Sequence, residues 1–241
     1  MNNGTMHTIR AFDEDLDQLR VQVLEMGGLA EAAITASVDA MIHRDLEGAL
    51  RVVENDRRID AMELEVERLA VRLIALRAPM ADDLRSVIAA LKIAGVIERM
   101  GDYAKNIAKR VPVLDAAGPL EPISVLPAMG RAVSHLVKDA LDAYANGDTE
   151  SAVLVCQRDR EIDDFYNSLF RTLLTYMMEQ PHNITPSAHL LFVAKNLERI
   201  GDHATNVAEM VYYAATGEQM TERTRGNDTT ANLGANMEKQ A

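Results

Sequence analysis

Acidic residues recur at a spacing of four in two regions of the chain, and each region has a second copy 103 or 100 residues later. Residues four apart on a helix lie one turn above one another, so each pair would form a column on one helical face. Like charges in such a column destabilise an isolated helix unless a cation neutralises them. The acids of the two copies are Asp56, Asp60, Glu98 and Asp102, then Asp159, Asp163, Glu198 and Asp202.

An amide follows each second column at the same spacing, Asn106 in the first copy and Asn206 in the second. Carboxylate and amide oxygens are ligands for hard or borderline cations such as Mg, Mn, Ca or Fe. A set with neither Cys nor His makes structural zinc less probable than these. The sequence therefore predicts an oxygen-ligated metal site in each copy, formed by Asp56, Asp60, Glu98, Asp102 and Asn106 and by Asp159, Asp163, Glu198, Asp202 and Asn206.

Two other interpretations of the acids stay open at this point. Lys105 or Lys109 could neutralise a column and leave a solvated face on a metal-free helical scaffold. A carboxylate cluster in a helical bundle could also serve a metal-dependent hydrolase or oxidase, although no base or nucleophile accompanies both copies. Basic residues near the acids could form a docking patch for a partner, and the candidates are Arg57, Arg85, Lys105 and Arg110.

The elements that position these acids are long amphipathic helices. Apolar residues recur in steps of three and four, for example at Ile97, Met100, Ala104, Ile107 and Val111, which is typical of a helix packed in a bundle. Turn residues and prolines interrupt the pattern, and Asp45 is a candidate N-cap. We expect helices near residues 8–43, 46–77, 81–111, 124–146, 149–179 and 185–215.

The chain contains an internal repeat of three helices. Residues 45–60 match residues 148–163 at eight of sixteen positions, and residues 98–106 match 198–206 at six of nine. Each copy has the size of a small bundle that can bury its own apolar seam. The expected organisation is a first repeat at 8–111, a proline-rich linker at 112–123, a second repeat at 124–216 and a disordered polar tail at 217–241.

Composition excludes several classes of protein. The formal net charge of −12 gives no general attraction for nucleic acid. No apolar run reaches the length of a spanning helix, and the first residues lack the apolar core of a signal peptide. The single cysteine, Cys156, cannot form an internal disulfide. These features predict a cytoplasmic protein that reaches a membrane only peripherally, through a partner.

The Glu-Arg-x-Gly-Asp blocks at 98–102 and 198–202, with Asp82-Asp83-Leu84-Arg85, resemble the PhoU family over about residues 8–215. The resemblance implies an all-α fold of two tandem three-helix bundles, six helices in all. It implies a cytoplasmic regulator, not an enzyme, that keeps the phosphate-starvation response repressed. Its implied partners are the ATPase subunit of the phosphate ABC transporter, the phosphate-sensing histidine kinase and a second copy of the chain. Implied metals are Fe, Zn, Mg or Mn at the acid motifs.

Overall fold

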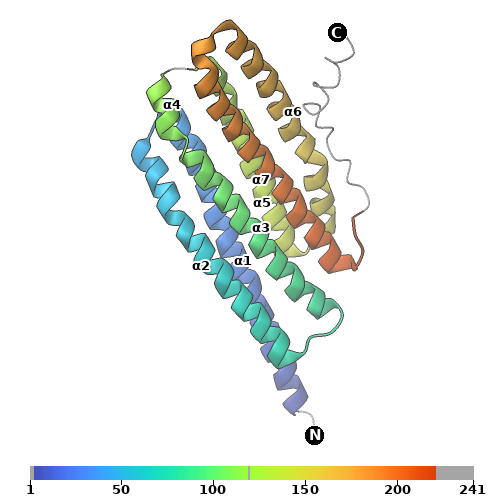
Figure 1. Cartoon of the computed structure of the whole chain (residues 1–241). Coiled ribbons are helices and arrows are strands. Elements are labelled where there is room, and N and C mark those ends of the chain that lie inside the picture. The colour runs from blue at the N-terminus through green and yellow to red at the C-terminus, as the bar shows by residue number, and fades with distance from the viewer. Residues whose placement is uncertain (1–2, 119, 221–241) are drawn as a thin grey trace.

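The computed structural model describes residues 3–118 and 120–220 and confirms an all-α fold built on six long helices (Figure 1). Within these residues no strand occurs, and no helix is long and apolar enough to cross a membrane. The expected tail falls mostly at 221–241, outside the described residues. The long helices are α1 (Asn3–His43), α2 (Leu46–Arg77), α3 (Asp82–Ala108), α5 (Leu126–Asn146), α6 (Thr149–Glu179) and α7 (Ile184–Thr216).

The proline-rich stretch after the first repeat contains more helix than the sequence suggested. Helix α3 ends at Ala108, three residues earlier than expected, and a short helix α4 (Val111–Ala117) follows. Pro112 fits there because the first turn of a helix needs no backbone donor from it. Two 3-10 turns, η1 (Glu121–Val125) and η2 (Pro181–Asn183), precede α5 and α7.

Aspartates cap the second helix of each repeat, as the aligned sequences predicted for Asp45. The Asp45 carboxylate accepts a hydrogen bond from the Gly48 backbone N–H at 2.8 Å. Asp148 caps α6 in the same way, with the Ser151 N–H at 3.1 Å. Such caps satisfy backbone donors that the first helical turn leaves unpaired. The two repeats therefore share their helix boundaries at this point as well as their sequence.

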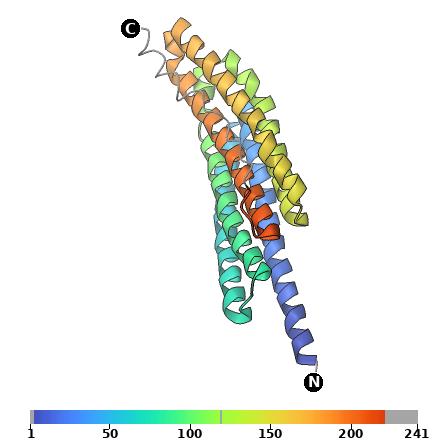
Figure 2. The same ribbon diagram turned by 90° about the vertical axis from the view of Figure 1, so that its right-hand side faces the viewer.

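The two repeats pack as one body around a pseudo-two-fold axis. Equivalent helices meet each other, α1 against α5 and α3 against α7, and α3 and α7 run in opposite directions (Figures 1 and 2). A Cβ atom on Gly27 would lie 2.6 Å from Leu141, and one on Gly130 would lie 2.9 Å from Val38. Gly130 is the equivalent of Gly27 at an offset of 103 residues, and Leu141 is the equivalent of Val38. The same close approach between α1 and α5 is therefore made twice.

A continuous apolar core follows the predicted seams. All five seam residues of α3 and its continuation, from Ile97 to Val111, are buried, as are Ile59, Val66 and Leu73 of α2. Met62 and Leu69, which lie between these α2 positions at the same spacing, are half-buried. Leu76, the next residue in that spacing, is 67% exposed. It lies in the last turn of α2, just before the turn at Ala78, where the hairpin projects beyond the core.

Candidate functional site

The α2–α3 hairpin brings the first four acids together, and we call Asp56, Asp60, Glu98 and Asp102 the first acid cluster. Lys105 lies between the two helices: its ammonium donates to Asp56 of α2 and to Asp102 of its own helix, the latter at 2.6 Å. The Asp56 side chain is only 5% exposed. The lysine that the sequence offered as a neutralising residue is therefore the internal counter-charge of this cluster.

The carboxylates of the first acid cluster affect one another's ionisation. Burial, followed by the charge of Asp56, raises the pKa of Asp60. Burial and then Asp102 raise the pKa of Glu98, with smaller effects of Asp60 and Asp56. Burial alone would lower the pKa of Lys105, but its hydrogen bonds to Asp102 and Asp56 raise it well above its usual value. One lysine thus faces four acids, and the cluster keeps an excess of negative charge.

Gly101 and Gly201 let the acid-bearing helices approach closely. A Cβ on Gly101 would lie 2.9 Å from Ile59 and 3.5 Å from an Asp56 carboxylate oxygen. At Gly201 the corresponding distances, to Ile162 and Asp159, are 2.9 and 3.0 Å. A mid-helix glycine lowers helix stability by about 1 kcal/mol relative to alanine. At both positions this glycine leaves room for the neighbouring aspartate, Asp56 or Asp159.

The second acid cluster, Asp159, Asp163, Glu198 and Asp202, has a different counter-charge. Lys195 donates to Glu198 Oε1 at 2.6 Å from three residues earlier on α7. The other oxygen of Glu198, Oε2, is buried and has no hydrogen-bond partner. Burial is the largest influence raising the pKa of Glu198, Lys195 opposes it, and Asp202 and Asp163 add to it.

The lysines of the two clusters are not equivalent by sequence. Thr205 takes the position of Lys105 in the second repeat, and its hydroxyl donates to the Asp202 backbone carbonyl at 2.7 Å. Gly95 takes the position of Lys195 in the first repeat. The two clusters are therefore neutralised by lysines at non-equivalent positions.

Tyr103 and His203 meet at the pseudo-two-fold axis between the clusters. Their rings stack with centroids 5.4 Å apart, and Arg199 lies 5.8 Å from the Tyr103 ring centre. Asn206 Nδ2 is 3.3 Å from His203 Nδ1, so this amide lies in contact with the axis. Burial, followed by the charge of Arg99, lowers the pKa of His203. Asn106 belongs to the same face of α3, but the structure pairs it with none of the acids of its repeat.

The four basic residues considered for partner docking do not form one surface. Arg85 lies in the first turn of α3, whereas Arg110 lies beyond the other end of that helix, as the N-cap of α4. Arg85 binds Asp82 at 2.7 Å, and Arg110 packs 4.2 Å above the Phe192 ring. Lys105 is held by the first acid cluster, and Arg57 is exposed on α2.

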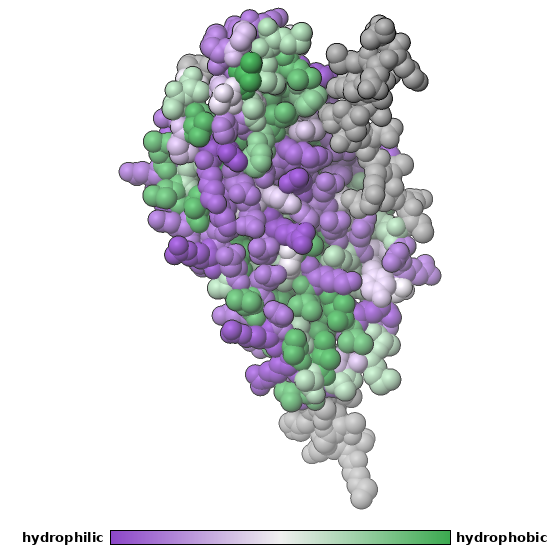
Figure 3. Space-filling model, in the orientation of Figure 1, coloured by the Kyte–Doolittle hydropathy of each residue, from purple (hydrophilic) through white to green (hydrophobic). Residues whose placement is uncertain are grey.

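The carboxylates of the two acid clusters have the chemistry to bind a cation through oxygen, but their side chains are not arranged around a common point. Within residues 12–118, 120 and 122–220, no group of three or more Asp, Glu, His or Cys side chains forms a ready-made metal site. The unpartnered Glu198 Oε2 and the mutual repulsion in the first cluster both favour an added positive charge. Hydrophilic residues gather across the middle of the face seen in Figure 3, between more hydrophobic ends.

The buried Glu198 gives a pH-dependent prediction for the metal-free protein. The pKa of Glu198 is raised in the folded protein, so the ionised carboxylate lowers the free energy of unfolding. This destabilisation disappears as the pH falls through the pKa of the folded state and the carboxylate is protonated. Replacing Glu198 with Gln should therefore raise the melting temperature at pH 8 by a few degrees. The gain should disappear below the ordinary glutamate pKa of 4.5, where wild type is also neutral. Thermal melts from pH 4 to 8 in a chelator test this, and a gain that persists at pH 4 contradicts it.

Comparison with models of protein families assigns the chain to a family. The model for the PhoU domain matches twice, at residues 23–111 and 126–211, which are the two repeats of the structure. The chain belongs to the PhoU family. The matched segments contain every residue of both acid clusters, so the clusters lie within the PhoU domains themselves.

PhoU relatives match along nearly the whole chain. A phosphate-specific transport system accessory protein PhoU homolog of Zymomonas mobilis is 59% identical over 95% of this chain and 97% of its own length. The PhoU protein of Serratia marcescens is 36% identical over 96% and 94% of the two chains. The crystal structure of PhoU from Pseudomonas aeruginosa superposes with a TM-score of 0.83 at 38% identity, covering 86% of this chain and all of that one.

Proposed function

We propose that this chain is a cytoplasmic, non-catalytic accessory protein that regulates phosphate uptake. The observation that carries the proposal is similarity along nearly the whole chain to phosphate-specific transport system accessory proteins, such as the relative that is 59% identical over 95% of the chain. A PhoU structure from Streptococcus pneumoniae, described as a phosphate transport system regulatory protein, matches with a TM-score of 0.82 at 30% identity over 87% of this chain and 99% of that one.

The proposed mechanism is binding. The chain would contact the ATPase subunit of the high-affinity phosphate transporter and the phosphate-sensing histidine kinase, and would itself form a homodimer. A conformational state of one partner biases the other when the adaptor binds its states unequally. The result would be repression of the phosphate-starvation response while phosphate is plentiful. The long helices support this because they present extended surfaces on a single packed body.

Each acid cluster would hold one or more cations as part of this function. The ligands would come from Asp56, Asp60, Glu98 and Asp102 in the first repeat and from the four equivalent acids of the second. A bound cation such as Fe, Mn, Mg or Zn would neutralise the carboxylates and link the two helices that carry them. In the first repeat Lys105 would have to give up its bonds to Asp56 and Asp102, so cation and lysine compete.

The regulatory proposal is tested by complementation. A strain that lacks this gene and carries a phosphate-starvation reporter should express the reporter even in excess phosphate. The intact chain should restore repression, and affinity capture from the complemented cells should recover the transporter ATPase and the histidine kinase. Constitutive reporter expression in the presence of the folded chain would overturn the proposal.

Metal binding gives a separate prediction. Protein reloaded with Mn²⁺ or Fe and then dialysed should retain stoichiometric metal by mass spectrometry. The variant Asp56→Asn/Asp102→Asn/Asp159→Asn/Asp202→Asn should lose at least nine-tenths of it, because it removes two ligands from each cluster. The control Asp17→Asn/Glu47→Gln/Asp82→Asn/Asp142→Asn changes the net charge equally at exposed sites and should keep the metal. Equal retention by both variants contradicts the assignment.

A further inference from the structure

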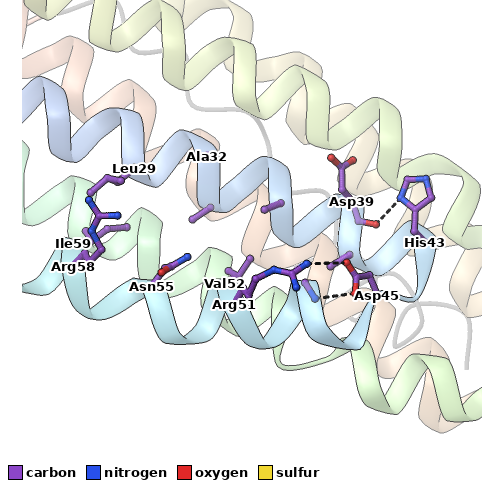
Figure 4. Close-up of a pocket in the computed structure, with 14 residues that line it drawn as sticks. Leu29, Ala32, Asp39, His43, Asp45, Arg51, Val52, Asn55, Arg58 and Ile59 are labelled. Carbon is purple, nitrogen blue, oxygen red and sulfur yellow. Dashed lines mark hydrogen bonds and ion pairs between the residues drawn. The ribbon is translucent and has the colours of Figure 1, made fainter.

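The grooves on the molecule differ in which helices form them. The groove between α1 and α2, drawn in Figure 4, has a volume of about 490 Å³, and its counterpart between α5 and α6 has about 350 Å³. Another groove, of about 610 Å³, has α3 of the first repeat and α7 of the second as its walls. We call it the α3–α7 groove. Met220, which follows the end of α7, lines it as well, so the chain itself enters this groove.

The end of α7 directs the chain along α3. Gly217 ends the helix in the left-handed conformation, with φ of 76°. A Cβ atom on Gly217 would lie 3.3 Å from the guanidinium carbon of Arg85, in the first turn of α3. Met220 is half-buried against the apolar core and lines the groove together with Ile88 and Lys92, which lie farther along α3. Between Gly217 and Met220 the chain therefore turns back and advances toward the middle of α3.

The walls of the α3–α7 groove carry opposite charges. Lys92 lies on the α3 wall and Glu209 on the α7 wall. The Lys92 side chain is exposed and forms no ion pair with a residue that the structure describes. In the sequence, Met220 is followed by Thr-Glu-Arg-Thr-Arg. An acid and a base, Glu222 and Arg223, therefore come just after the point that the chain has reached in the groove.

The other half of the molecule shows the chain covering the equivalent place. With the offset of 100 residues, Phe192 takes the position of Lys92 and Arg110 that of Met210. The Arg110 guanidinium lies 4.2 Å from the Phe192 ring centre. Arg110 begins α4, the segment that follows α3, and α4 packs against α7. The chain that leaves α3 thus covers part of α7, and the α3–α7 groove lies where the chain that leaves α7 would cover part of α3.

We propose that residues 221–225 bind in the α3–α7 groove as an extended strap. Successive side chains of an extended chain lie on opposite sides, so Glu222 would contact Lys92 on one wall and Arg223 would contact Glu209 on the other. At about 3.3 Å per residue, Glu222 and Arg223 lie about 7 and 10 Å beyond Met220. The wall from Ile88 to Lys92 is about 6 Å long, and the lysine side chain extends its reach by a similar length.

The strap would hold the end of the second repeat against the first. It joins the last turn of α7 to α3 through residues that lie outside both matched PhoU domains, at 23–111 and 126–211. This inference goes beyond the proposed function and does not depend on it. A chain without the strap could still repress the reporter, and a chain with it could fail to do so.

Electron paramagnetic resonance measures whether the strap is docked. Nitroxide labels are attached at Thr224→Cys and at Glu65→Cys, an exposed position of α2, in a Cys156→Ser background. The parent protein should give one narrow distribution of distances between the labels. Lys92→Glu should widen this distribution at least twofold, because Glu222 would then meet a like charge. The charge exchange Lys92→Glu/Glu222→Lys should restore the narrow distribution.

Lys138→Glu is the matched control, because it makes the same charge change at an exposed position of α5. It should leave the distribution of label distances unchanged. Limited digestion with trypsin reports on the same segment without labels. Lys92→Glu should speed cleavage after Arg223 at least fivefold, whereas Lys138→Glu should leave the cleavage rate unchanged.

Several outcomes would overturn the strap. These are a broad distribution in the parent protein, a narrow one that persists in Lys92→Glu, a charge exchange that fails to restore it, or equal widening in Lys138→Glu. Circular dichroism melts of every variant separate release of the strap from unfolding. Release widens the distribution while the helical signal and its melting temperature are kept, and widening that occurs only with loss of helix contradicts the inference.

Discussion

Replacing Lys105 with methionine should lower the free energy of unfolding of the metal-free protein by about 2–4 kcal/mol. The substitution keeps the aliphatic stem but leaves Asp56, which is 5% exposed, without its cation. The remaining carboxylates of the cluster then repel one another without compensation. Urea denaturation in a chelator measures the change. The double variant Lys105→Met/Asp56→Asn should recover most of the loss, because it removes the buried charge that the lysine neutralised.

Lys138→Met is the matched control for Lys105. Lys138 pairs with Asp142 at 2.6 Å, but both side chains are more than half exposed, so its loss should leave the urea midpoint almost unchanged. Equal effects of the two substitutions would show that the buried contacts of Lys105 stabilise the fold no more than an exposed ion pair does. If the cluster also holds a cation, millimolar Mn²⁺ should stabilise Lys105→Met more than wild type, because no lysine competes with it.

The second large effect is expected at the seam between the repeats. Gly27→Val should cost about 2–3 kcal/mol, because side-chain atoms would be forced into Leu141, which a Cβ already approaches to 2.6 Å. Gly28→Val, one residue further along the same helix, meets nothing within 4 Å and should change stability by less than about 0.5 kcal/mol. Because Gly130 makes the equivalent contact with Val38, Gly130→Val should resemble Gly27→Val.

Urea denaturation curves of the three glycine variants test the seam. A single transition in each variant would show that the two repeats unfold together. A Gly28→Val variant as unstable as Gly27→Val would mean that the loss comes from the helix and not from contact between α1 and α5. Strongly unequal effects at Gly27 and Gly130 would contradict the pseudo-two-fold arrangement of that seam.

The fold could be predicted because it depends on patterns that one sequence contains. Apolar spacing located six long helices, and the duplication showed that they divide into two groups of three. The boundary near Ala108 was missed by three residues because Pro112 suggests a break, whereas in the structure it lies in the first turn of α4. Proline position within a turn, and not proline count, decides such a boundary.

The site was predictable only where both partners lie on one hairpin. Asp56 and Asp102 meet because a short turn joins α2 to α3, and Lys105 was recognisable as a neutralising residue for the same reason. Lys195 was missed because it precedes its cluster and has no counterpart in the first repeat.

The pseudo-two-fold axis also has an evolutionary consequence. A homodimer of a three-helix chain must carry every substitution on both sides of its axis, because one gene encodes both halves. Fusing the halves into one chain removes that constraint and keeps each at high effective concentration near the other. Here one half has Lys105 between its acid-bearing helices, while the other has Lys195 at its acid cluster and an ion pair between Asp139 and Arg158 that joins α5 to α6. Tandem fusion therefore gives a symmetric scaffold two faces that can be selected independently for different ligands.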